Sequence, residues 1–162
     1  MDVKATSQPY AETLDGAPLV RSAPGPRHEL ICSRLHDGVR ACVAQLPSTR
    51  LLPPRFKVQV SSRNALCPDL ALVALPTAKL WLAAEIIDSE DHQSDTVVKK
   101  QIYEETGLAR LWMIDPRYDN VEIYHGSAYG LVLKGILAGT QALTEKLLPG
   151  FQMSITELFR AP

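Results

Sequence analysis

A glutamate at the centre of an apolar strand places the strongest constraint on the fold of this chain. Glu85 lies within residues 81–87, a run whose other six members are all apolar. An ionised carboxylate that is buried without a partner costs several kcal/mol, or its pKa rises until the group is neutral. The neighbours of Glu85 must therefore supply a proton, a cation or hydrogen-bond donors.

A second acidic residue, Asp69, is predicted to face Glu85 across a hairpin. Asp69 begins the apolar run 69–75, and a short connector with Pro76 separates that run from the Glu85 strand. If the hairpin is symmetric about Thr77, the two acids lie opposite one another with Cβ atoms about 4.5–5.5 Å apart. Like charges at that distance destabilise a sheet unless a proton or cation lies between them, and two carboxylates suit Mg2+ or Mn2+. The alternative is that the register slips by one residue, or that Asp69 merely starts a strand and lies in solvent.

A helix is predicted from about Ser94 to Thr106, ended by Gly107. Lys99 borders the inward face of this helix, and its long stem can extend along apolar surface toward the two carboxylates. Asp95 lies one turn before it. Alone, Asp95 and Lys99 are interpreted as a surface ion pair, whereas beside two buried acids they become candidates for a site.

These residues resemble the site of the PD-(D/E)XK nuclease superfamily, and the chain is similar to its Uma-type restriction endonucleases. In that family the lysine two residues after the glutamate is lost, and a lysine of the following helix replaces it. Here position 87 is Ile87, and Lys99 follows Glu85 by 14 residues. The resemblance covers nearly the whole chain, and further matching segments are residues 15–20, 23–28, 103–107, 111–116, 121–124, 147–151 and 158–159. One departure is the acidic stretch 88–91, where the family often has Ser-Pro-Ser.

The resemblance implies one nuclease-like domain over residues 1–162, with an endonuclease activity that hydrolyses DNA phosphodiester bonds. Its expected cofactor is Mg2+ or Mn2+, held by Asp69, Glu85 and the carbonyl of Ile86. Asp69, Glu85 and Lys99 are the implied catalytic residues. His28 and Asp95 are accessory candidates. A lone histidine at a helix start is more often a surface or hydrogen-bonded residue.

Two other interpretations stay open. The domain can be an inactive nuclease-fold module that binds nucleic acid or a protein partner, which the formal net charge of −1 and the acidic stretch 88–91 favour. Alternatively, the two carboxylates face apart and the domain is a structural assembly partner.

The charge distribution gives no general electrostatic attraction for nucleic acid, so any DNA contact depends on a local patch. Most of the basic side chains near the candidate site are interpreted as solvated surface. They are Arg21, Arg27, Arg34, Arg40, Arg50, Arg55, Lys57 and Arg63. A homodimer is expected, because two sites cut two strands most easily.

The three cysteines, Cys32, Cys42 and Cys67, show no metal-binding spacing and are interpreted as reduced core residues of a cytoplasmic protein. The sequence contains no secretion signal, membrane span, nucleotide-binding loop or nucleophile elbow, so no organic cofactor and no membrane are expected.

The remaining pattern predicts an α/β fold, in which a restriction endonuclease-like mixed sheet is flanked by helices. About residues 1–10 are candidates for disorder, and a hairpin turns at Asp15-Gly16. Gly135 and Gly139 are expected to flank a turn between two late strands. The further predicted elements are helices over 27–46 and 155–159 and strands over 56–60, 110–115, 120–124, 129–134 and 141–146.

Overall fold

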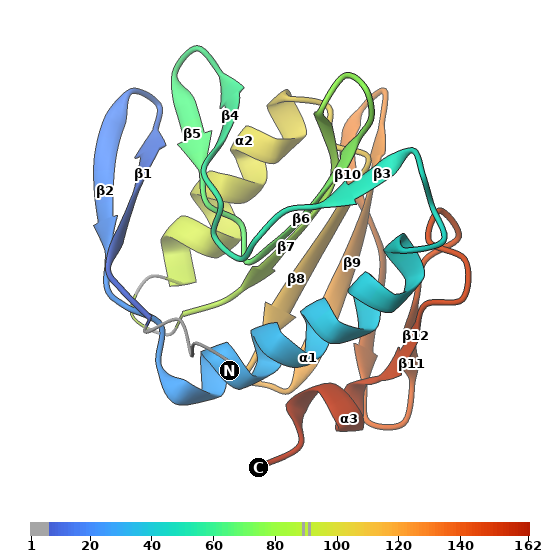
Figure 1. Cartoon of the computed structure of the whole chain (residues 1–162). Helices are drawn as coiled ribbons and strands as arrows, with labels where there is room; N and C mark the ends of the chain where they lie inside the picture. The colour runs from blue at the N-terminus through green and yellow to red at the C-terminus, as the bar shows by residue number, and fades with distance from the viewer. Residues whose placement is uncertain (1–6, 89, 91) are drawn as a thin grey trace, which may run out of the picture.

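The computed structural model describes residues 7–88, 90 and 92–162. A six-stranded mixed sheet forms its centre, with helices on both faces (Figure 1), which confirms the predicted α/β class. The central sheet has the order β10-β9-β8-β7-β6-β3, and all its neighbouring strands are antiparallel except β7 and β8. Its strands are β3 (Thr49–Leu51), β6 (Leu70–Ala74), β7 (Lys79–Ile86), β8 (Arg110–Asp115), β9 (Asn120–Ser127) and β10 (Gly130–Ala138).

The crossover between the parallel strands β7 and β8 carries the helix that was predicted over 94–106. It consists of a π-helical turn, η1 (Ser94–Lys99), and an α-helix, α2 (Lys100–Glu105). Parallel neighbours require such a crossover, and it brings the carboxyl ends of both strands to one edge of the sheet. Gly107, with a φ of 73°, follows the helix in the left-handed region that favours glycine.

A smaller sheet lies beside the crossover helix and has the order β2-β1-β5-β4. Its strands are β1 (Tyr10–Leu14), β2 (Ala17–Arg21), β4 (Val58–Ser61) and β5 (Asn64–Leu66). The β1–β2 hairpin turns at Asp15 and Gly16, both with positive φ, as the sequence predicted.

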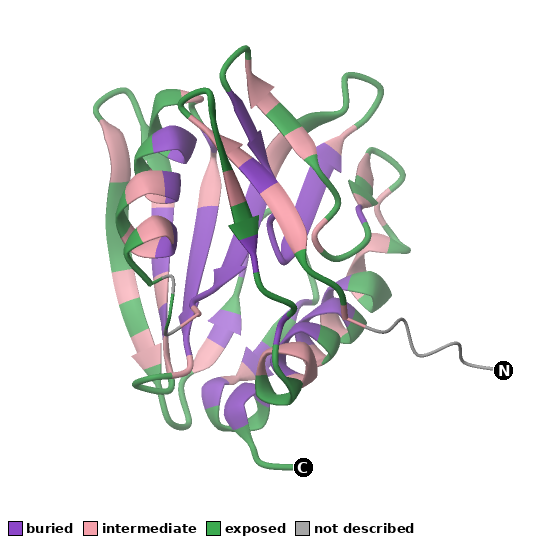
Figure 2. Cartoon of the chain, turned by 90° about the vertical axis from the view of Figure 1, so that its left-hand side faces the viewer, coloured by how far each residue is buried: buried purple, intermediate pink, exposed green. Residues whose placement is uncertain are grey.

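The opposite face of the central sheet is covered by α1 (Pro26–Val43) and α3 (Ile155–Phe159), with the two-stranded ribbon of β11 (Ala142–Thr144) and β12 (Gln152–Ser154) beside them. Side chains alternate across β7, so Ala84 packs toward α1 while Ala83 packs toward α2. The central strands are accordingly buried on both faces (Figure 2). Glu85 shares the α2 face with Ala83, which puts its carboxylate under the crossover helix.

The predicted register of the β6–β7 hairpin is confirmed in the half near the site. Leu70 pairs with Ala84 and Leu72 with Leu82, the pairing expected for symmetry about Thr77. A one-residue shift follows between Leu72 and Val73, close to the turn. Because this irregularity lies at the far end, Leu70 keeps the predicted register, and Asp69 directly precedes it at the start of β6.

Several details differ from the sequence expectations, and the strands β3, β5 and β12 were not predicted. β10 runs through Gly135 with a bulge, so Gly135 lies within a strand, and only Gly139 belongs to the turn. At the amino end, Ser7 Oγ donates a hydrogen bond to Glu29 and Tyr10 begins β1, whereas residues 1–6 of the stretch proposed for disorder lie outside the described residues. Among the described helices, none combines the length and apolar character that a bilayer crossing demands.

Candidate functional site

Asp69 is held at the edge of β7 by donors from three segments. The Ile86 N–H donates to Asp69 Oδ2 at 2.8 Å, His28 Nε2 donates to Oδ1 at 2.8 Å, and Arg55 Nη1 donates to Oδ1 at 3.2 Å. Asp69 is only 3% exposed, so the alternative that it lies in solvent is wrong. His28 thus lies next to Asp69, as the sequence suggested, and its ring is hydrogen-bonded to that carboxylate.

These donors keep Asp69 ionised. Burial alone would raise the pKa of Asp69, but the charge of His28 and the hydrogen bonds from His28 and Ile86 outweigh it and lower the pKa to about 2. Burial would lower the pKa of His28, and the Asp69 carboxylate raises it instead.

Arg55 belongs to the same cluster, although the sequence suggested a solvated side chain. Its φ is 58°, an uncommon value for a residue other than glycine. The Arg55 N–H donates to the Pro68 carbonyl at 2.9 Å, and its Nη2 lies 2.8 Å from Glu29 Oε1. Both ends of Arg55 are thus fixed, and strained backbone of this kind concentrates at functional sites.

Lys99 reaches Glu85 along the path that the sequence predicted. Its Nζ lies 2.7 Å from Glu85 Oε1, and the Tyr103 hydroxyl donates to the same oxygen at 2.6 Å. All three side chains are buried. The π turn η1 carries Lys99, and π-helical turns occur frequently at functional sites.

The charges around Glu85 oppose its ionisation. Burial, followed by repulsion from Glu12, Asp69 and Asp95, outweighs the attraction of Lys99 and raises the pKa of Glu85 to about 8. For Lys99 the balance has the opposite sign, because nearby carboxylates outweigh burial and raise its pKa. Lys99 is therefore a cation at neutral pH.

Two residues of the first hairpin join this cluster, and the sequence did not single them out as site residues. Glu12 Oε1 lies 2.7 Å from Lys99 Nζ, and Glu12 Oε2 lies 2.9 Å from Arg21 Nη1. Arg21 Nη2 in turn lies 3.0 Å from Asp95 Oδ1. The interpretation of Asp95 as a surface residue paired with Lys99 is wrong, since Asp95 is 1% exposed and binds Arg21. Arg21, at 4% exposure, is likewise not solvated. The sequence signal that could have identified these residues is an acidic residue in the middle of a strand, Glu12, with Arg21 near its pairing partner on the hairpin.

The donor set fits a divalent cation. Glu12, Asp69, Glu85 and Asp95 are four buried carboxylates that share the cations Arg21, Arg55 and Lys99, so the ionised carboxylates outnumber the arginine and lysine side chains paired with them once Glu85 is ionised as well. Within the described ranges no cluster of three or more His, Cys, Asp or Glu side chains has metal-binding geometry. Mg2+ does not require one, because it binds through one or two carboxylates with carbonyl and water oxygens.

The Ile86 carbonyl is oriented to serve as a further ligand. The Ile87 N–H donates to Ile114 on β8 at 2.8 Å. Backbone groups alternate along a strand, so the N–H and carbonyl of Ile86 point to the other edge, where Asp69 lies. No described residue donates to Glu85 Oε2, and this oxygen is available to a cation.

Of the acidic stretch 88–91, the structure describes Asp88 and Glu90, and Asp88 borders the site. The Asp88 N–H donates to Asp95 Oδ2 at 3.1 Å, and Glu90 is exposed. Ser89 and Asp91, which complete the stretch, lie outside the described residues.

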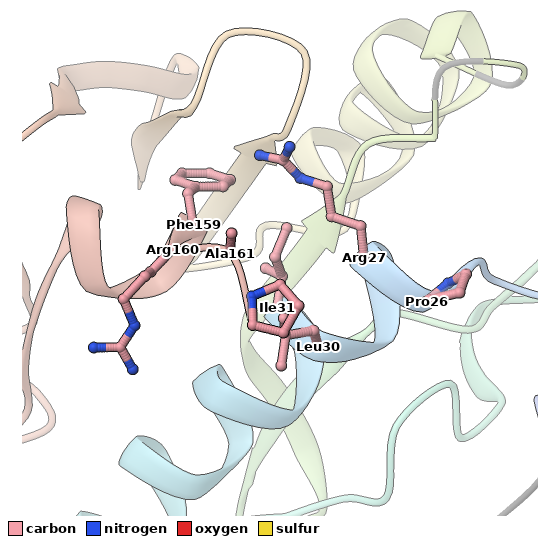
Figure 3. Close-up of a pocket in the computed structure, with 8 residues that line it drawn as sticks. Pro26, Arg27, Leu30, Ile31, Phe159, Arg160 and Ala161 are labelled. Carbon is pink, nitrogen blue, oxygen red and sulfur yellow. The ribbon is translucent and has the colours of Figure 1, made fainter.

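Two hollows in the described part of the chain lie beside the carboxylates or further along α1. A hollow of about 170 Å³ is lined by Glu29, Cys32, His36 and Arg55, which surround Asp69 on its α1 side. A larger pocket of about 320 Å³ lies between α1 and the last residues of the chain, with Arg27 and Arg160 at its rim (Figure 3). No residue of the carboxylate–lysine cluster lines this larger pocket within the described part of the chain.

Comparison with known proteins gives the family of this chain and a solved structure with the same fold. The family model Uma2, described as "Putative restriction endonuclease", matches residues 3–156. A solved structure described as a putative nuclease belonging to DUF820, from Anabaena variabilis ATCC 29413, superposes with a TM-score of 0.76 at 16% identity, over 94% of this chain and 91% of that one. No curated protein matches this sequence.

Proposed function

Since this chain belongs to the Uma2 family of restriction endonuclease-like proteins, we propose that it is a metal-dependent endonuclease that hydrolyses DNA phosphodiester bonds. The observation that carries the proposal is the junction at Ile86. Asp69 binds the backbone N–H of Ile86, and the next residue back, Glu85, binds the ammonium of Lys99. Two carboxylates and one cation thus meet at the end of a single strand.

The proposed roles follow from these contacts. Asp69, Glu85 and the Ile86 carbonyl would hold Mg2+ or Mn2+. When bound, such an ion polarises a phosphoryl oxygen and lowers the pKa of an attacking water. Lys99 is a cation, so it donates hydrogen bonds to the developing charge on phosphorus oxygens rather than accepting a proton. His28 and Arg55 keep Asp69 ionised and oriented.

Nicking of supercoiled plasmid in the presence of Mg2+ or Mn2+ tests the proposal. Glu85→Gln and Lys99→Ala are expected to abolish nicking while circular dichroism remains that of the parent. Lys100→Ala is the matched control, because Lys100 neighbours Lys99 but lies over the Tyr124 ring, 4.4 Å from its centroid. Equal nicking by Asp69→Asn and the parent would rule out this site.

A second candidate function is a nuclease-fold module that binds DNA or a protein partner without cleaving. The observation that favours it is that protein donors already occupy Oε1 of Glu85 and both oxygens of Asp69. A purified protein that binds Mn2+ in calorimetry, or DNA in a gel shift, yet never nicks plasmid would select this function.

The proposal includes a homodimer and a cytoplasmic location. Cleavage of both DNA strands is easiest with two copies of the site, and sedimentation equilibrium would reveal them. Cys32, Cys42 and Cys67 are free thiols, which agrees with a reducing compartment.

A further inference from the structure

The first hairpin contributes two buried charged side chains to the surroundings of Lys99. Tyr10 on β1 pairs with Arg21 on β2, so Glu12 and Arg21 are diagonal neighbours on that hairpin. Their ion pair, Glu12 Oε2 to Arg21 Nη1, measures 2.9 Å, and neither side chain is more than 4% exposed. The hairpin therefore directs a fully formed ion pair inward.

One oxygen of Glu12, Oε1, contacts two parts of the site. Oε1 accepts from the Cys67 N–H at 2.8 Å and lies 2.7 Å from Lys99 Nζ. Cys67 precedes Asp69 by two residues, so Glu12 ties the lysine to the loop that carries the aspartate. The Lys99 ammonium is held between carboxylates of two different sheets, Glu12 and Glu85, each at 2.7 Å. An ammonium has three donors, and these two carboxylates are its ion-pair partners among the described residues.

Arg21 closes a ring around the same lysine. Its second nitrogen binds Asp95, which lies on the η1 turn four residues before Lys99. Asp95 also accepts from the Asp88 N–H at the start of the crossover. The chain of contacts from Lys99 through Glu12, Arg21 and Asp95 thus returns to the turn from which Lys99 extends. It restrains the lysine at both its ammonium and its backbone.

Stability alone does not account for this ring. Buried ion pairs are on average no more stabilising than apolar side chains of similar volume, because each charge loses its hydration. The hairpin is already joined by five residue pairs and contacts β5 through Thr13 and Ala65. Apolar side chains at 12 and 21 would suffice to pack it.

We propose that Glu12 and Arg21 are positioning residues that hold Lys99 in its working orientation, so that the first hairpin is a functional part of the site. This inference rests on the proposed nuclease function, and it adds two residues to the three that the family motif contains.

Plasmid nicking kinetics test the inference in full-length protein. Glu12→Gln is expected to lower kcat by about 10- to 100-fold, as for other residues that orient a catalytic group, with KM for DNA unchanged. Glu12→Asp, which keeps the charge, should recover part of the loss. Asp15→Asn is the charge-matched control, because Asp15 is exposed in the turn of the same hairpin. Equal kcat in Glu12→Gln and Asp15→Asn would overturn the inference.

A packing control separates positioning from hairpin docking. Leu14 packs against the core on the α2 side, and its side chain is apolar and takes no part in the ion pairs of Glu12. Leu14→Ala should lower Tm while leaving kcat near that of the parent. If Leu14→Ala and Glu12→Gln lose kcat equally at equal Tm, the role of Glu12 is structural and the inference fails.

A readout without catalysis distinguishes this inference from the proposed function. Acetic anhydride labelling followed by mass spectrometry should leave Lys99 unmodified in the parent while the exposed Lys79 reacts. In Glu12→Gln, Lys99 is expected to react, and in Asp15→Asn it is not. An inactive parent protein would refute the nuclease proposal, whereas an unreactive Lys99 in Glu12→Gln would refute the positioning role.

Discussion

Replacing Glu85 with glutamine is expected to stabilise the metal-free protein, and increasingly so as the pH rises. Glutamine has nearly the shape of the protonated carboxyl group and never ionises. Lys99 keeps its second partner, Glu12, at 2.7 Å, so the substitution leaves no unpaired buried cation. The parent, by contrast, must ionise a buried acid that three carboxylates repel.

The magnitude follows from the pKa of Glu85, which is raised from 4.5 to about 8. The folded state binds this proton more tightly than the unfolded state does. The contribution of this proton to the free energy of unfolding is therefore fully present below pH 4.5 and is lost as the pH rises toward 8. At about 1.4 kcal/mol per pH unit, the parent loses up to about 4 kcal/mol relative to Glu85→Gln between about pH 5 and pH 8. For a chain of this length, 1 kcal/mol shifts Tm by about 2–4 °C.

Thermal and urea unfolding in EDTA at several pH values would measure this difference. Exposed Glu105, at the end of α2, supplies the control variant Glu105→Gln, which should follow the parent at each pH. Mn2+ should then raise the Tm of the parent at pH 8 and not that of Glu85→Gln. A difference between Glu85→Gln and the parent that is the same at all pH values would refute the reasoning, because the pKa of Glu85 would then be the same in the folded and unfolded states.

Three further outcomes are expected. Asp69→Asn should show the opposite pH dependence in urea unfolding, because the pKa of Asp69 is lowered from 3.8 to about 2. The loss of stability, up to about 2 kcal/mol, is complete above pH 4 and vanishes as the pH falls toward 2. Lys99→Met should lower the unfolding free energy by about 3–5 kcal/mol at pH 8, because its two carboxylate partners lose a buried cation, and a change below 1 kcal/mol would contradict the burial of this ion pair. Gly126→Ala should destabilise the protein by about 1–3 kcal/mol or more, since a Cβ there would lie 2.2 Å from the Leu108 carbonyl oxygen. Gly135→Ala is the control, because the space around its Cβ is open, and equal Tm values for the two variants would disprove the clash.

The catalytic candidates could be predicted because local rules relate them. Asp69 and Glu85 belong to one hairpin, whose register follows from a turn between two apolar runs. Lys99 belongs to the next element, and helical periodicity alone indicates that it borders the buried face. Each step spans fewer than 20 residues, so no knowledge of distant packing was needed.

Arg21 and Arg55 show where this reasoning ends. In the sequence, both arginines lie near a segment that contains proline or glycine, and arginine side chains are ordinarily exposed to solvent. In the fold, Arg21 meets Glu12 and Asp95, and Arg55 meets Glu29 and Asp69. These contacts depend on how two sheets and a helix are docked, which no periodicity encodes.

The sequence by itself determined most strands of the central sheet, the register at the site end of the β6–β7 hairpin and the need of Glu85 for a compensating charge, because alternation, turn residues and burial act over short stretches. Only the tertiary structure decided which charges supply that compensation. Glu12 and Lys99 are separated by 87 positions in the chain, yet their charged atoms are 2.7 Å apart, since the hairpin and the crossover helix pack on the same face of the central sheet.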